Sequence, residues 1–127
     1  MSGKLLYEYA VIRLLPRVER EEFINVGVIL FSREARFIKT LYTIDEEKLR
    51  LFTSELEIDS LRDSLHVFDK ICSGEAEGGS IASMPIQERF RWLTAIRSTS
   101  LQTSRPQMGF SDDPDKTLER LFNEFVL

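Results

Sequence analysis

Two apolar runs rich in β-branched residues open the chain, at residues 5–15 and 22–32. β-Branched and aromatic side chains favour extended backbone, so each run predicts a β-strand. Pro16 ends the first run, because proline has no N–H group to donate. The second run alternates with the period of two that is typical of a strand. One expected face holds Ile24, Val26, Val28 and Leu30, and the other holds Phe23, Asn25, Gly27, Ile29 and Phe31.

A third strand is predicted at residues 36–43, and the short connectors favour an antiparallel β-meander of about three strands. Apolar residues at helical spacing then predict about four helices that pack on the sheet and cover a face of it. These helices are expected to begin after Asp45, at Asp59 or Ser60, after Pro85, and at Asp113–Pro114. Residues 75–83 are expected to form a surface loop, and residues 98–112 an irregular polar segment. The sequence therefore predicts an α+β fold and a single domain over residues 1–127.

Composition narrows the function classes. The net charge of −4 and the pI near 5.1 disfavour non-specific DNA binding, which needs a basic surface. The longest apolar run, residues 26–31, is too short to span a membrane, and residues 1–10 do not resemble a signal peptide. A single cysteine excludes an intramolecular disulfide. These features predict a cytoplasmic protein without membrane association.

The residue types that carry catalysis are sparse. Cys72 and His66 are expected on one helix, six positions apart, where they face different directions and cannot form a nucleophilic pair. One Cys and one His cannot make the usual zinc site. The acidic run at residues 112–115 suits a helix N-terminus better than Mg²⁺. No phosphate-binding loop or GxSxG motif is present. We expect no metal, no cofactor and no catalytic residues, and the sequence favours a non-enzyme.

Asn25 and Gly27 stand out inside an apolar strand, where a polar side chain and a missing side chain are both costly. They predict either a small pocket for a ligand, or a bulge or close helix crossing in which Asn25 hydrogen-bonds backbone groups of the neighbouring loop. Trp92 fits either the rim of the core or an interface anchor.

A second candidate site is an arginine cluster. Arg13 interrupts an apolar strand, and Arg97 and Arg105 bracket a segment rich in hydroxyl residues that includes Ser104. Guanidinium groups together with hydroxyls are typical of phosphate or carboxylate recognition. The alternative is that Arg13 pairs with Glu8 or Glu22 and that the segment is ordinary surface.

Two stretches carry a family resemblance, YEYAVIRLLPRVEREEFINVGVILF at residues 7–31 and RSTSLQTSRPQMGFSDDPDKTLERLF at residues 97–122. The chain resembles domain-of-unknown-function family 3037, a family of small bacterial proteins without an established activity. The resemblance covers nearly the whole chain. Because members are often encoded beside kinases similar to HipA, it implies an accessory subunit of such a kinase. The motif positions that it marks as candidate binding residues are Arg13, Glu22, Asn25, Gly27, Arg97, Arg105 and Gly109.

Two functions from different classes follow. The first is a non-enzymatic protein-binding or regulatory module, with a HipA-like kinase as its suspected partner. The second is an enzyme or sensor that binds a phosphate-bearing small molecule or nucleic-acid end, with Arg13, Arg97 and Arg105 holding the anion. A homodimer formed through an exposed sheet edge or face is a third, structural prediction.

Overall fold

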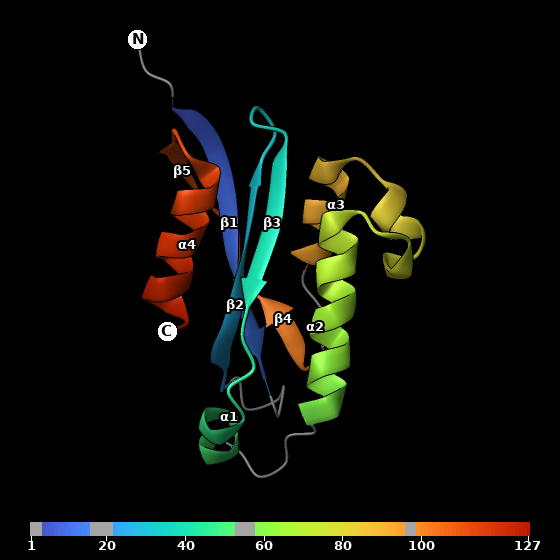
Figure 1. The fold of residues 1–127 in the computed structure, drawn as a ribbon, viewed down its shortest axis with the longest axis vertical. Coiled ribbons are helices and arrows are strands. Elements are labelled where there is room, and N and C mark those ends of the chain that lie inside the picture. Colours follow the sequence, from blue (N-terminus) through green and yellow to red (C-terminus); the bar gives the residue numbers. More distant parts are fainter. Residues whose placement is uncertain (1–3, 16–21, 53–57, 96–98) are drawn as a thin grey trace.

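A computed structural model describes residues 4–15, 22–52, 58–95 and 99–127 of the chain. Its elements in chain order are β1 (Leu5–Leu14), β2 (Ile24–Ser32), β3 (Phe37–Tyr42), α1 (Glu46–Phe52), α2 (Ile58–Ser73), α3 (Ile86–Leu93), β4 (Leu101–Thr103), β5 (Gln107–Ser111) and α4 (Pro114–Phe125), with two short 3-10 helices between α2 and α3. The predicted α+β class is confirmed. Figure 1 shows the sheet between α4 on one face and α2 and α3 on the other. Within the described ranges, no helix is long and apolar enough to cross a membrane.

Within the described residues the sheet has five strands, where the sequence predicted about three. Its order is β3-β2-β1-β4, and β5 also pairs with β1. All pairings are antiparallel. β4 and β5 both lie in the segment 98–112 that was expected to be irregular, so that expectation was wrong. These strands are short, and they form because β1 offers a second edge to them, which no local sequence pattern records.

Ser104 explains how one edge of β1 holds two separate strands. β4 pairs with residues 12–14 and β5 with residues 5–9, so residues 104–106 bridge the gap. Ser104 N donates to the carbonyl oxygen of Val11 at 2.8 Å, and Val11 N donates to Ser104 Oγ at 2.8 Å. The Ser104 hydroxyl therefore takes the place of a backbone carbonyl in the ladder.

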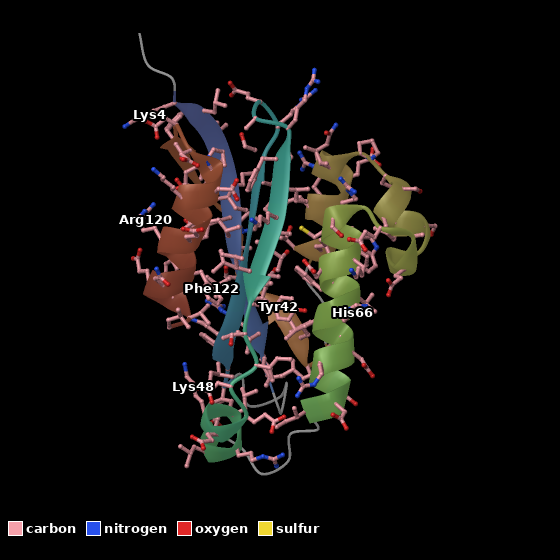
Figure 2. The ribbon with its side chains drawn as sticks, viewed as in Figure 1. Lys4, Tyr42, Lys48, His66, Arg120 and Phe122 are labelled. Atoms are coloured by element: carbon pink, nitrogen blue, oxygen red, sulfur yellow. The ribbon has the colours of Figure 1, made fainter. Side chains whose placement is uncertain are left out.

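The helices cover both faces of the sheet rather than one. On the α2 and α3 face, Phe31 stacks on Phe90 with ring centroids 5.1 Å apart. On the other face, Leu118 and Leu121 of α4 pack against Val28 and other residues of the sheet, and Figure 2 shows Phe122 of α4 at the sheet. Burial on both faces accounts for the unbroken apolar run in β2.

A β-bulge lies at Val26 of β2. Ile12 pairs with Gly27 and Arg13 with Asn25, which leaves Val26 without a partner on β1. The extra residue shifts the alternation, so Val26 packs in the α2-side core while Asn25 faces α4. The predicted common face for Asn25 and Gly27 is therefore wrong, and of the two predicted alternatives the structure shows the bulge.

Gly27 has no room for a side chain. A Cβ atom there would lie 2.7 Å from the carbonyl oxygen of Leu41 and 2.9 Å from Cβ of Tyr42. Since both neighbours belong to β3, the glycine is required by the close approach of the two strands at the bulge.

Candidate functional site

A groove of about 740 Å³ lies between α2, the end of α3 and β4. We call it the α2–β4 groove; Figure 1 shows the elements that form it. The described residues that line it are Leu14, Ser60, Leu61, Asp63, Ser64, Val67, Phe68, Ile71, Trp92, Leu93, Ala95, Thr99, Ser100, Leu101, Gln102 and Thr103.

Helix α2 forms one wall of the groove with a row of residues that lies beside the row facing the core. Ser60, Ser64, Val67 and Ile71 follow one another at helical spacing, so they share one face. Val67 is 46% exposed and Trp92, on the opposite side of the groove, is 40% exposed. Large apolar side chains are thus open to solvent above a buried apolar floor.

The β4 wall is held in place by its own hydrogen bonds. Thr99 Oγ1 donates to the carbonyl oxygen of Leu101 at 2.8 Å, and Gln102 Nε2 donates to the carbonyl oxygen of Thr99 at 2.8 Å. Leu15 N donates to the carbonyl oxygen of Ser100 at 2.6 Å, which ties this wall to the end of β1. The wall is therefore formed before any ligand arrives, which lowers the entropy cost of binding.

Thr103 adds a polar group that has no partner. Its Oγ1 is buried and makes no hydrogen bond, although the residue lines the groove. A buried hydroxyl without a partner is destabilising by about 1–3 kcal/mol.

The charge of the groove is small and negative. Asp63 is the one charged residue among the described residues that line it. No described Arg, Lys or His belongs to the lining. The groove therefore suits an apolar or cationic group better than an anion.

The arginine candidates do not line the groove. The guanidinium of Arg13 lies over the ring of Phe23, 4.1 Å from its centroid. The Arg13 Nε is buried and has no hydrogen-bond partner among the residues that the structure describes. Arg105 is exposed between β4 and β5. Arg97 lies outside the described residues, so the predicted anion cluster stays a prediction.

Three other candidates have structural roles. Asn25 Nδ2 donates to the carbonyl oxygen of Phe125 at 2.9 Å, at the end of α4. A Cβ atom on Gly109 would lie 2.6 Å from the Tyr7 hydroxyl, so this glycine makes room for the ring across the β1–β5 pair. Ser104 completes the β1 ladder. The remaining candidate, Glu22, is exposed just before β2.

The two residues considered for nucleophilic chemistry are separated. Cys72 is 1% exposed, and this burial raises the pKa of its thiol to about 12, where it is not a nucleophile at neutral pH. His66 is exposed on α2 (Figure 2), with its Nε2 3.0 Å from Glu77 Oε2.

The acidic run at residues 112–115 serves the start of α4, as predicted. Asp113 Oδ1 accepts from Lys116 N at 3.2 Å, and Asp115 Oδ1 accepts from Lys39 Nζ at 3.0 Å. Across the described part of the chain, no group of three or more His, Cys, Asp or Glu residues could hold a metal ion.

The groove was not foreseen, although part of its signal is in the sequence. The spacing of Ser60, Ser64 and Val67 marks a second, half-polar stripe on α2. Such a stripe shows where a helix faces something other than the core. Thr103 carried no signal, because its position depends on the unforeseen strand β4.

Fold and groove together define a small α+β protein with helices on both faces of an antiparallel sheet and a solvent-open, mostly apolar groove at one sheet edge. A family described as "Protein of unknown function (DUF3037)" matches residues 9–126, and the chain belongs to that family. A search of the curated proteins found no match. A search of the solved structures found none either.

Proposed function

We propose that this protein is a non-catalytic protein-binding module whose α2–β4 groove takes an apolar segment of a partner protein. The observation that carries the proposal is the exposure of Trp92 and Val67 over a buried apolar floor. Tryptophan is enriched among the residues that dominate binding energy, and it acts best beside residues that exclude water. The hydroxyl and amide groups of the β4 wall supply the polar rim that such interfaces have.

The lining also limits the chemistry of the partner segment. Asp63 is the charged group among the described lining residues, so flanking lysine or arginine on the partner is favoured over acidic residues. We therefore propose an apolar segment with basic flanks as the occupant.

The kinase relationship supplies the first partner to test. The family resemblance implies a HipA-like kinase encoded nearby, and we propose that kinase as the protein that carries the segment. Co-expression followed by size-exclusion chromatography tests this. We expect the two proteins to elute together; separate elution would show that the kinase is not the partner.

The groove itself is tested by Trp92→Ala in the co-expressed complex. We expect the dissociation constant to rise by about tenfold or more, since removal of a central aromatic anchor costs on the order of 2 kcal/mol. Leu51→Ala is the matched control, because Leu51 is 90% exposed and does not line the groove. Equal affinity for Trp92→Ala and the unmodified protein would exclude the groove as the binding surface, even if the kinase binds elsewhere.

A further inference from the structure

A second exposed apolar surface lies where β1 begins and β5 runs beside it. We call it the β5 edge patch, and it consists of Leu6, Met108 and Phe110, which are 38%, 71% and 68% exposed. The register pairs Leu6 with Phe110 and Glu8 with Met108, so all three apolar side chains lie on the same sheet face. This surface is separate from the groove, because β5 pairs with residues 5–9 of β1 and β4 with residues 12–14.

The strand that carries this patch has an open edge. Among the described strands, β5 pairs with β1 and with no other. Proteins usually protect such an edge with charged residues or proline inside the strand. β5 has the sequence QMGFS and contains neither, while Pro106 and Asp112 lie just outside it. Gln107, Met108 and Phe110 are exposed, while Ser111 at the end of the strand is buried. The backbone groups of residues 107–110 that face away from β1 are therefore available to another strand.

The sequence of β5 is complementary to itself. In an antiparallel pair of two β5 strands centred on Gly109, Met108 lies opposite the partner's Phe110, and Phe110 lies opposite the partner's Met108. Thioether–aromatic contacts and apolar cross-strand pairs of this kind are favourable. No like charges face each other in this register, because none of the five residues is charged.

We propose that β5 pairs with β5 of a second copy of this chain around a two-fold axis at Gly109. The pairing makes one continuous antiparallel sheet across a homodimer, and each copy covers the Met108 and Phe110 side chains of the other. A second copy fits better than an unrelated strand, because symmetry places a complementary side chain at both positions at once.

Sedimentation equilibrium of the full chain tests the dimer. We expect the mass of two 14.8 kDa chains for the unmodified protein. Phe110→Lys is expected to raise the dissociation constant of the dimer by roughly tenfold or more, because each copy loses an apolar cross-strand pair. Leu51→Lys, at an exposed apolar position outside the patch, should leave the dimer intact.

A charge-exchange pair tests the register. Met108→Glu and Phe110→Lys should each weaken the dimer alone, while a mixture of the two variants should restore it, since opposite charges then face each other across the axis. A monomeric unmodified protein, or a dimer that Phe110→Lys does not weaken, would overturn the proposal. Failure of this dimer leaves the groove proposal untouched, because Trp92 and Val67 lie outside the patch.

Discussion

Asn25 links β2 to the end of α4 through one hydrogen bond, from its Nδ2 to the carbonyl oxygen of Phe125. Asn25→Ala would leave that carbonyl without its partner. We expect the free energy of unfolding to fall by about 1–3 kcal/mol, measured by urea denaturation. Asn123→Ala is the control, because Asn123 is an exposed amide on the same helix and its removal should change stability by less than about 0.5 kcal/mol. Similar losses for both variants would contradict the assigned role.

Cys72 gives a second test at the scale of single residues. Burial raises the pKa of its thiol from 9.0 to about 12. Below pH 9.0 the thiol is protonated in both the folded and the unfolded state. Between 9.0 and about 12 it ionises in the unfolded state alone, so its contribution to stability is lost as the pH rises through that window.

The stability loss is checked by urea denaturation at pH values on both sides of 9.0. The burial of the thiol is checked separately by labelling at about pH 8, below the ordinary thiol pKa. Folded protein should react only as fast as it unfolds, and urea should make the thiol accessible. Ser73→Cys in a Cys72→Ala background is the matched control, since position 73 is exposed next to the buried one. Equal labelling rates at the two positions would show that the thiol is not protected.

At the scale of elements, Ser104 continues the hydrogen-bond ladder on β1 between β4 and β5. Ser104→Ala removes the oxygen that accepts from Val11 N, so we expect the Val11 amide to exchange its hydrogen faster. Stability should fall by about 1–3 kcal/mol, because a buried N–H loses its partner. Ser104→Thr keeps the hydroxyl and should exchange more slowly than the alanine variant. Unchanged Val11 exchange in Ser104→Ala would show that the ladder does not depend on the hydroxyl.

The sequence predicted the elements whose signal is local. The alternation in residues 22–32 gave β2, and the Asp113–Pro114 pair gave the start of α4, where Asp113 caps the helix. Gly74, with φ of 76°, follows the end of α2, where the left-handed backbone favours glycine.

Features that depend on distant contacts were not predictable in the same way. β4 has three residues and exists because β1 accepts it, so residues 99–103 gave no strand pattern. The bulge at Val26 reverses the alternation of β2, and hydrophobicity alone does not show the reversal because both faces are apolar. The groove could be predicted only in part, because one of its walls is β4.

At the scale of the whole molecule, the apolar core under α2 and the apolar core under α4 share the strands β1 and β2. Leu65 lies in the core under α2 and Leu118 in the core under α4, and both are fully buried. We expect Leu65→Ala and Leu118→Ala each to lower the free energy of unfolding by about 2–5 kcal/mol.

Loss of the helices from one face of the sheet would expose apolar residues of β1 and β2, so neither core is expected to unfold alone. Both variants should therefore still unfold in a single transition. Trp92 fluorescence reports on α3 and far-ultraviolet circular dichroism on all helices. Coincident curves from the two signals would confirm the coupling of the two faces, and separate midpoints would contradict it.

The position of β1 in the sheet also has a consequence for synthesis on the ribosome. β1 is made before the other strands of this sheet, yet residues 5–9 pair with residues 107–111, which are made about 100 residues later. At a synthesis rate of about 5–20 residues per second, the second edge of this apolar strand remains unpaired for roughly 5–20 seconds. During that interval a chaperone that binds extended apolar segments of nascent chains has access to β1, and the sheet can close only after β5 has been made.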